Sequence, residues 1–291
     1  MYRNKYRVII PFLIPSILLY VTFVLYPYGR SMYISLTQWR GLARAPVFIG
    51  LENFQHMWGD SNFWNALGNN AFYIVVLPIF TLSLAIFFAF IFSQGVPLSK
   101  FYRVTYFFPQ VMSVVAIGVL WSFVYHPTIG ILTSILQMVG IEAPPVWLGN
   151  PDTVLGAVAG VTIWHEVGFY MILFLAAMES IPMTYYEAAM LDGASRSHLF
   201  WNITLPMIRD TLQTGVIFLM INATNMFAIT QTMTEGGPSR SSEVLSTYLY
   251  NEAFINSNFG YGTAIAVALF FLTLVISVVL SRLLSRETLE Y

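Results

Sequence analysis

The chain has 291 residues, of which 57% are hydrophobic and 9% are charged, and its formal net charge is −1. A soluble domain carries about 25% charged residues, so the composition excludes a water-soluble globular protein of this size and indicates an integral membrane protein. The small net charge argues against a nucleic-acid partner. The absence of cysteine excludes disulfides and thiolate metal sites, and the four histidines lack the spacing of a metal-binding pair.

Six long apolar stretches follow one another along the chain. A helix needs about 20 mostly apolar residues to cross the hydrocarbon core of a bilayer, and continuous apolar runs favour helices over the alternating strands of a barrel. The stretches lie at residues 8–28, 69–93, 104–125, 154–178, 211–233 and 259–281. The sequence therefore predicts an all-α membrane protein with six transmembrane helices.

The distribution of lysine and arginine predicts the orientation of these helices, because positive residues concentrate in cytoplasmic loops. With the N-terminus inside, nine basic residues lie in the cytoplasm, namely Arg3, Lys5, Arg7, Lys100, Arg103, Arg196, Arg209, Arg282 and Arg286, and four lie outside, namely Arg30, Arg40, Arg44 and Arg240. We therefore expect both termini in the cytoplasm. Residues 1–68 are predicted to form the first transmembrane helix, retained as an anchor, and an extracytoplasmic loop, and residues 69–285 the core.

The segment at residues 180–210, between the fourth and fifth stretches, is too polar to cross a membrane. Pro182 ends the preceding helix, Thr184 and Glu187 have the spacing of a capping box, and Gly193 can end a short helix with a positive φ. A second short helix is predicted at residues 197–204. Two short helices joined by Gly193 would form a compact protrusion whose small alanines permit close contact with a groove of another protein.

The same segment resembles the EAA motif of permeases from binding-protein-dependent ABC importers. That motif is glutamate-alanine-alanine, three residues, glycine, nine residues, isoleucine, one residue and leucine-proline, and the matching residues are Glu187, Ala188, Ala189, Gly193, Ile203, Leu205 and Pro206. Residues 50–54, 235–238, 243–250 and 258–262 also resemble carbohydrate-uptake permeases, in particular the first permease of maltose-type systems. The large extra periplasmic domain of the maltose member is missing, so the chain looks closer to the shorter disaccharide, oligosaccharide or glycerol-phosphate members.

The resemblance implies a type I ABC importer transmembrane domain in the cell membrane and a set of partners. These are a second permease in a heterodimer, a cytoplasmic ATPase dimer, an extracytoplasmic substrate-binding protein, a carbohydrate and membrane lipid. Residues 180–210 would be the coupling segment, with the contacts to the ATPase made through Glu187, Ala188, Ala189, Asp192, Gly193, Arg196 and Pro206. The chain has no G-x-x-x-x-G-K-[ST] phosphate loop, so ATP must be bound by another polypeptide and no cofactor is expected here.

Polar residues inside the apolar stretches are candidates for the substrate pathway, because such groups tend to face a cavity. The fourth stretch holds Trp164, His165, Glu166 and Tyr170, and Glu166 can either face the pathway or pair with His165 or a partner chain. The fifth stretch holds Asn222, Thr224, Asn225 and Gln231. On a continuous helix Thr224 and Gln231 share one face, and Asn222 and Asn225 another.

Other functions fit the residues less well. An ion-driven secondary transporter predicts membrane-embedded acids in a relay and inverted repeats, whereas Glu166 is the one carboxylate well inside a stretch and no repeat is visible. A membrane enzyme lacks a paired nucleophile and base or a metal-ligand spacing. Glycerol 3-phosphate remains an alternative substrate, although the stretches contain no arginine to meet a phosphate, which favours a neutral sugar.

Overall fold

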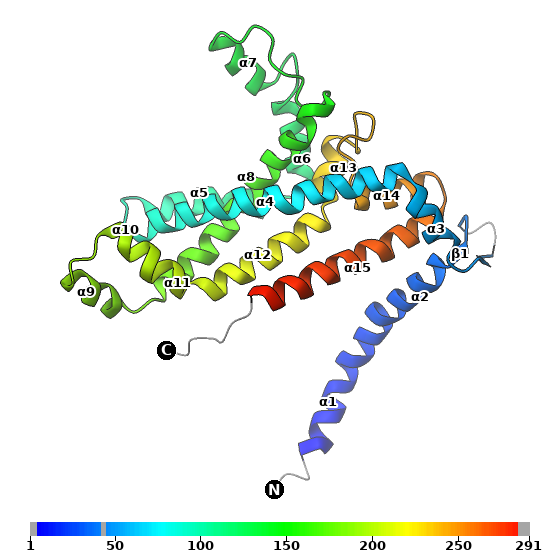
Figure 1. Ribbon diagram of the computed structural model, residues 1–291, viewed down its shortest axis with the longest axis horizontal. Coiled ribbons are helices and arrows are strands. Elements are labelled where there is room, and N and C mark those ends of the chain that lie inside the picture. Colours follow the sequence, from blue (N-terminus) through cyan, green and yellow to red (C-terminus); the bar gives the residue numbers. More distant parts are fainter. Residues whose placement is uncertain (1–4, 42–44, 285–291) are drawn as a thin grey trace. The chain divides into compact units, whose positions relative to one another are not determined.

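The computed structural model describes residues 5–41 and 45–284 (Figure 1). Arg3, Arg44 and Arg286, three of the basic residues behind the predicted orientation, lie outside the described residues, and the placement of the termini stays a prediction. The prediction of an all-α protein is confirmed for the described residues, apart from one short hairpin of strands β1 (Thr37–Gln38) and β2 (Val47–Phe48).

The described helices vary widely in length. They are α1 (Lys5–Tyr20), α2 (Tyr26–Ser35), α3 (Glu52–Gly59), α4 (Ser61–Ser93), α5 (Ser99–Val111), α6 (Val114–Val124), α7 (Ile131–Met138), α8 (Pro151–Glu179), α9 (Met183–Leu191), α10 (Arg196–Leu199), α11 (Leu205–Met207), α12 (Arg209–Thr224), α13 (Ala228–Met233), α14 (Leu245–Tyr250) and α15 (Phe259–Leu284). The π-helical turns η1 (Val21–Leu25), η2 (Phe200–Thr204) and η3 (Asn251–Ile255) continue α1, α10 and α14.

The chain divides into two units, and the first is formed from Met1–Phe63 and Tyr248–Phe270. Its hairpin pairs Thr37 with Phe48 and Gln38 with Val47 in antiparallel register. The Asn53 side chain on α3 donates to the carbonyl oxygens of Ser35 and Thr37, at 2.8 and 2.9 Å, and so ties the end of α2 to α3. Helix Pro11–Ser35 is apolar and exposed along most of its length, with Ser35 buried at its end, as expected of a helix that meets lipid or another subunit.

Asp60 joins distant parts of this first unit. Its carboxylate accepts hydrogen bonds from the hydroxyls of Tyr248 and Tyr261. Burial alone raises the pKa of Asp60, but these two bonds and those from the backbone of Asn62 and Phe63 outweigh burial and hold the pKa below its ordinary value of 3.8. The ionised carboxylate therefore stabilises the junction between α3 and α4 against α14 and α15.

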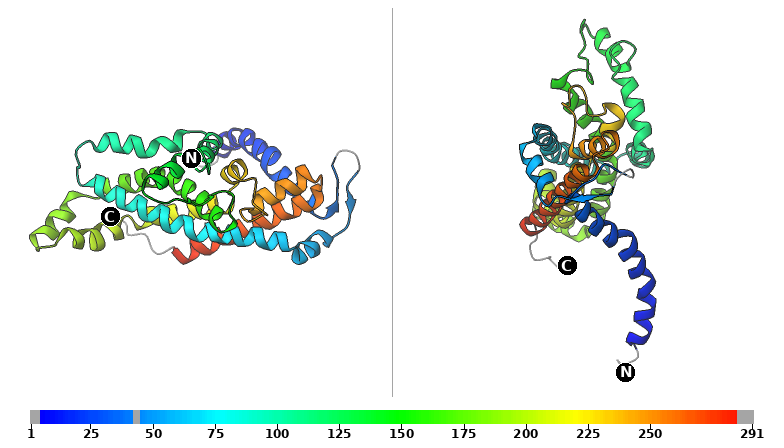
Figure 2. Two further views of the ribbon diagram at one scale, coloured as in Figure 1. Left: turned by 90° about the horizontal axis from the view of Figure 1, so that it is seen from above. Right: turned by 90° about the vertical axis from the view of Figure 1, so that its right-hand side faces the viewer.

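The second unit, Trp64–Thr247 with Phe271–Tyr291, is organised around α8. Helices α5 and α8 pack along each other (Figure 2), and a Cβ added at Gly168 of α8 would lie only 2.0 Å from the carbonyl oxygen of Tyr106 on α5. Helices α6 and α13 make a similar close pair, because a Cβ at Gly118 would lie 2.8 Å from that of Thr232. Glycine is required at both contacts for the two backbones to approach.

Among the described residues, four helices are long and apolar enough to span a membrane: Pro11–Ser35, Ser61–Ser93, Pro151–Glu179 and Phe259–Leu284. They match the first, second, fourth and sixth predicted stretches. The third stretch falls on α5 and α6, which are bent by 100° and count as a fifth span if they cross together. The fifth stretch is divided into α12, of 16 residues, and α13, of 6. The count of six spans therefore stays a prediction.

Candidate functional site

Segment 180–210 folds as two short helices joined at Gly193, as predicted. Helix α9 ends in a Schellman arrangement, in which the N–H of Ala194 donates to the carbonyl of Ala189 at 2.9 Å and the N–H of Gly193 to that of Met190 at 3.0 Å. This geometry needs a left-handed residue after the helix, and Gly193 supplies a φ of +83°. Gly193 therefore fixes the direction in which the chain leaves α9.

The predicted capping box at Thr184 and Glu187 is wrong. Helix α9 begins at Met183, Pro182 occupies the capping position, and no side chain caps the helix. The reason is that Pro182 has a φ of −59° with an extended ψ of 131°, which starts the helix before Thr184 can act as its cap. The second helix begins at Arg196 rather than at residue 197, and its N-cap is Ser195, whose hydroxyl accepts from the N–H of His198 at 3.3 Å.

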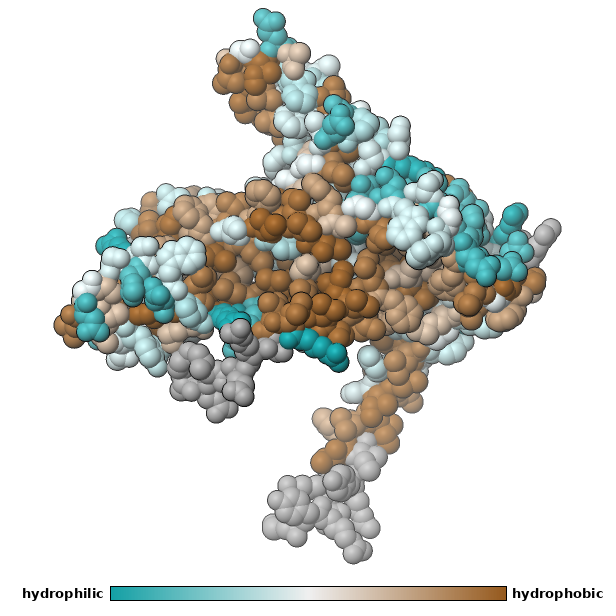
Figure 3. Space-filling model, in the orientation of Figure 1, coloured by the Kyte–Doolittle hydropathy of each residue, from teal (hydrophilic) through white to brown (hydrophobic). Residues whose placement is uncertain are grey.

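The predicted contact residues lie on the surface of this coupling segment. Glu187, Ala188, Asp192, Gly193, Arg196 and Pro206 are exposed and Ala189 is half-buried. Apolar side chains are exposed beside them, above all Leu191, which is 90% exposed. Figure 3 shows this mixture of apolar and polar side chains over α9. Exposed apolar groups rimmed by polar ones are typical of protein–protein contact surfaces.

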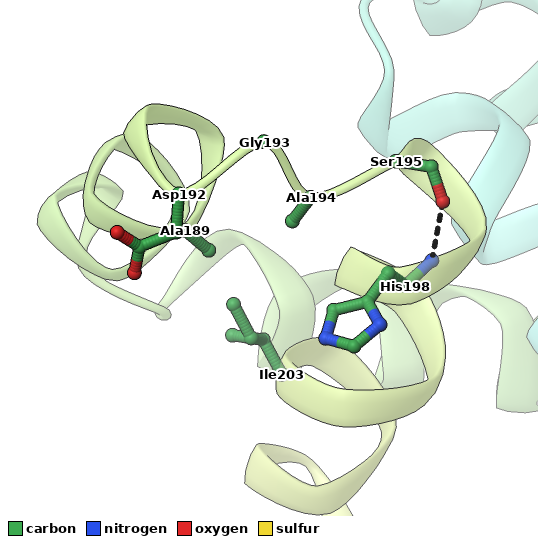
Figure 4. Close-up of a pocket in the computed structure, with 7 residues that line it drawn as sticks. All are labelled: Ala189, Asp192, Gly193, Ala194, Ser195, His198 and Ile203. Atoms are coloured by element: carbon green, nitrogen blue, oxygen red, sulfur yellow. Dashed lines mark hydrogen bonds between the residues drawn. The ribbon is translucent and has the colours of Figure 1, made fainter.

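A groove of about 410 Å³ opens between the two short helices (Figure 4). Asp192 lies on the α9 side and the His198 ring and the Ile203 side chain lie on the opposite side, below the chain that connects Gly193 to Ser195. The lining residues are Ala189, Asp192, Gly193, Ala194, Ser195, His198 and Ile203. The EAA residues Ala189, Gly193 and Ile203 thus come together around one concave surface.

A hydrogen bond joins two parts of this segment, a ring contact attaches it to α4, and an ion pair lies directly before it. The hydroxyls of Tyr186 and Thr204 lie 3.0 Å apart and join α9 to η2. The ring of Phe200 packs on Phe90 of α4, with ring centroids 4.6 Å apart. At the end of α8, directly before the segment, Glu179 accepts from Arg103 of α5 at 2.6 Å. The segment is therefore held against α4 by Phe200, and it continues directly from the end of α8 that Arg103 of α5 contacts.

The pathway candidates on α8 have different surroundings. Glu166 is mostly buried, and its Oε1 lies 3.2 Å from Nδ1 of His165, so the pairing that the sequence left open is present. Trp164 is partly exposed and packs edge-on against Trp121 of α6, with centroids 5.3 Å apart. Tyr170 is fully buried and lies within electrostatic reach of Glu166 and the Asn222 amide. The structure thus brings Glu166, Tyr170 and Asn222 together.

The pathway candidates of the fifth stretch lie beside an interruption in the helix, residues 225–227. Asn222 is exposed near the C-terminal end of α12. Asn225, which is also exposed, is the C-cap residue of this helix. Gln231 lies beyond the interruption on α13, and its Oε1 is buried without a hydrogen bond to any described residue. The expectation that Thr224 and Gln231 share one face is wrong, because the helix does not continue between them and Thr224 is fully buried.

Sequence reasoning missed two polar residues that hold this interruption, Asn70 on α4 and Ser246 on α14. Asn70 donates to the carbonyl of Thr224 at 3.0 Å, and Ser246 donates to that of Met226. The signal was present for Asn70, since an amide inside a predicted span indicates a function for that amide. Its partners are 154 and 175 residues away in sequence and could not be read from the pattern.

Comparisons with known proteins agree with the geometry. A family model described as binding-protein-dependent transport system inner membrane component matches residues 81–288. The diacetylchitobiose uptake system permease protein NgcF of Streptomyces coelicolor is 38% identical, over 88% of this chain and 76% of that protein. The probable ABC transporter permease protein YurN of Bacillus subtilis is 34% identical, over 94% of each chain.

Among solved structures, a chain of a bacterial ABC transporter involved in the import of the acidic polysaccharide alginate superposes with a TM-score of 0.87. It is 22% identical, over 98% of this chain and 97% of that chain, so the likeness establishes the fold. Together with the EAA residues around one exposed groove, these matches show that the chain belongs to the family of inner membrane components of binding-protein-dependent ABC transport systems.

Proposed function

We propose that the chain is one of two different permease subunits in an ATP-driven importer, and that the imported substrate is a sugar of the disaccharide or oligosaccharide class. The observation that carries the proposal is the coupling segment, in which an exposed helix, a left-handed glycine and a groove follow the EAA spacing. The sugar class is supported by the diacetylchitobiose permease that resembles the chain over most of its length.

In this proposal the coupling segment binds the ATPase dimer. Glu187 accepts hydrogen bonds from the ATPase surface or forms an ion pair with a basic residue there. Asp192 and Arg196 make contacts at the edge of the groove. Gly193 sets the angle between the two short helices. Pro206 lies in the first turn of α11 and directs the chain toward α12. Closure of the ATPase dimer on ATP moves the segment. Its contact with α4 and its direct continuation from α8 carry the motion into the bundle, which alternates between two states.

The proposed pathway runs past Trp164, Glu166, Tyr170, Asn222, Asn225 and Gln231. Sugars present hydroxyl groups and apolar ring faces, and this set combines carboxylate and amide groups with aromatic rings. A binding protein delivers the sugar from outside, and ATP is bound and hydrolysed by a separate polypeptide. The chain itself is then not an enzyme and needs no cofactor.

The proposal is tested with the chain reconstituted in proteoliposomes together with its second permease, its ATPase and its binding protein. We expect ATP-dependent accumulation of at least one labelled saccharide from a panel that contains diacetylchitobiose and maltose. The variant Glu187→Ala should abolish the stimulation of ATP hydrolysis by loaded binding protein while the complex still assembles. Glu142→Ala, which removes a carboxylate outside the coupling segment, is the matched control and should leave the stimulation unchanged.

Two other results would lead to a different conclusion. Accumulation of sn-glycerol 3-phosphate without any saccharide would keep the importer and change its substrate class. Accumulation that follows a proton or sodium gradient and ignores ATP would replace the ABC importer with a secondary transporter, since only the latter uses the ion gradient directly.

A further inference from the structure

The interruption at residues 225–227 has a specific set of hydrogen-bond partners. Helix α12 ends at Thr224, so its last carbonyl groups have no further helical N–H to pair with. The side-chain amide of Asn70, in the N-terminal third of α4, donates to the carbonyl of Thr224 at 3.0 Å and lies 3.4 Å from that of Ala223. The hydroxyl of Ser246 donates to the carbonyl of Met226.

Asn70 also holds the segment that follows. Its Oδ1 accepts from the N–H of Leu245 at 2.8 Å, so one side chain pairs with the end of α12 and with the start of α14. Asn70 is fully buried, and Thr224 and Leu245 are buried around it. Both the donor and the acceptor of the amide are used, which fixes its orientation and hence the position of the interruption.

Non-helical backbone inside a predicted span is tolerated only where it is buried in protein or lines a water-filled cavity. Here the buried side is occupied by Asn70 and Ser246, while Asn222 and Asn225 are exposed on the chain. Exposed amides within a span are unfavourable in contact with lipid, so they are expected to face a water-filled cavity. Interrupted helices of this kind place polar groups at substrate sites in other transporters.

We propose that Asn70 is a positioning residue for transport: it holds the interruption open so that Asn222 and Asn225 face the translocation path. Asn70 itself makes no contact with the substrate. The proposal rests on the proposed function, because it assumes that the bundle encloses a path whose access changes with the state of the ATPase.

The chain lacks cysteine, so the substitution Asn225→Cys introduces its only thiol. In the reconstituted complex we would measure how fast a charged methanethiosulfonate reagent modifies this thiol, by mass spectrometry of this chain, without nucleotide and with ATP and vanadate. We expect modification in at least one state and a change in rate of about fivefold or more between states, in the range of ordinary conformational coupling. Adding Asn70→Ala should abolish the difference between the states.

The matched control is Asn65→Ala on the same helix. Asn65 also donates from its amide to a backbone carbonyl, that of Arg240 at 2.7 Å, but it does not touch the interruption. With Asn65→Ala the rate difference should persist. If Asn70→Ala prevents assembly, Ser246→Ala is used in its place, because it removes only the bond to Met226.

Asn70→Asp distinguishes positioning from a general loss of stability. A protonated carboxyl group can donate to the carbonyl of Thr224 and accept from Leu245, whereas an ionised one can only accept. The state dependence should therefore return as the pH is lowered, and Asn70→Leu should show no such recovery. A loss of stability alone would not be reversed by acid.

The proposal is overturned if the thiol at position 225 resists the charged reagent in every state, because the interruption then faces lipid or packed protein. It is also overturned if Asn70→Ala leaves the rate difference intact, or if Asn70→Asp and Asn70→Leu behave alike at every pH. Failure of the proposed function looks different: ATP and vanadate would then change nothing in the parent Asn225→Cys complex, while uptake follows an ion gradient.

Discussion

The coupling segment and the interruption of the fifth stretch are both built from short helices, but they are stabilised in opposite ways. The segment is largely exposed, and the hydrogen bond between Tyr186 and Thr204 joins residues only 18 positions apart. The interruption is buried on one side, and the amide of Asn70 bridges residues 154 and 175 positions away. The proposed contact surface is thus formed by one continuous stretch of sequence, whereas the buried polar junction requires residues from three helices.

The largest effect is expected in the interior, at the contact between α5 and α8. A side chain at Gly168 would meet the backbone of Tyr106 at 2.0 Å, which no rotamer can relieve. We expect Gly168→Val to destabilise the fold by about 3 kcal/mol or more and to prevent recovery of a monodisperse complex in size-exclusion chromatography. Gly156→Ala on the same helix, where a Cβ would meet nothing within 4 Å, is the control. Normal recovery of both variants would contradict the close packing.

An intermediate effect is expected at Gly193, where the surface segment depends on backbone conformation and not on packing. A Cβ there has open space, but φ is +83°, so Gly193→Ala costs about 1–2 kcal/mol of local strain. We expect the stimulation of ATP hydrolysis by loaded binding protein to fall several-fold. Gly95→Ala carries the same kind of strain at a φ of +74°, in the turn before α5, and should lower the melting temperature without affecting stimulation.

If Gly95→Ala reduces the stimulation as strongly as Gly193→Ala does, general destabilisation explains both, and the coupling segment has no special role. Equal stimulation in the unmodified protein, in Gly193→Ala and in Gly95→Ala would show that the angle set by Gly193 is not needed for coupling.

A smaller effect is expected from Tyr186→Phe, which removes the bond between α9 and η2 and leaves the ring in place. Loss of one partly buried hydrogen bond corresponds to about 1 kcal/mol. We expect faster hydrogen exchange of the α9 amides, measured by mass spectrometry, with no change in α8. Faster exchange throughout the second unit would contradict the view that the segment's bonds are local.

The smallest effect concerns Asp60 in the first unit. Like Asn70 at the interruption, Asp60 forms hydrogen bonds with residues that are distant in sequence. Its pKa is lowered in the folded protein, so its stabilisation is present above the ordinary value of 3.8 and is lost as the pH falls through and below that value. We expect the melting temperature of the detergent-solubilised chain to fall between about pH 5 and about pH 2, and Asp60→Asn to reduce this fall. An identical fall in both proteins would show that other carboxylates cause it.

Much of the fold followed from the sequence because hydrophobic length alone locates a spanning helix, as it did for α4, α8 and α15. The same measure failed at residues 211–233, where the composition is apolar enough but the helix stops at Thr224. Nothing local requires that stop, since Asn225 is tolerated inside helices. The stop is held by Asn70 and Ser246, which the chain brings together only on folding.

The coupling segment was easier to predict in outline than in detail. Gly193 adopts the left-handed conformation expected from its place after an Ala-rich helix, and the two short helices are present. The cap was assigned to Thr184 because its spacing to Glu187 fits a capping box, but Pro182 already fixes the first turn. The motif determines which residues are exposed together, and the proline determines where the helix begins.

The glycine contacts at Gly168 and Gly118 restrict how the second unit can change shape. At both contacts the neighbouring helix is too close to admit even a Cβ, so α5 can shift little against α8, and α6 can shift little against α13. The two pairs also touch each other, because Trp121 of α6 packs on Trp164 of α8 and α13 contacts α8. A change of shape in this unit is therefore easiest where the backbone is not helical, at the bend between α5 and α6 and at residues 225–227.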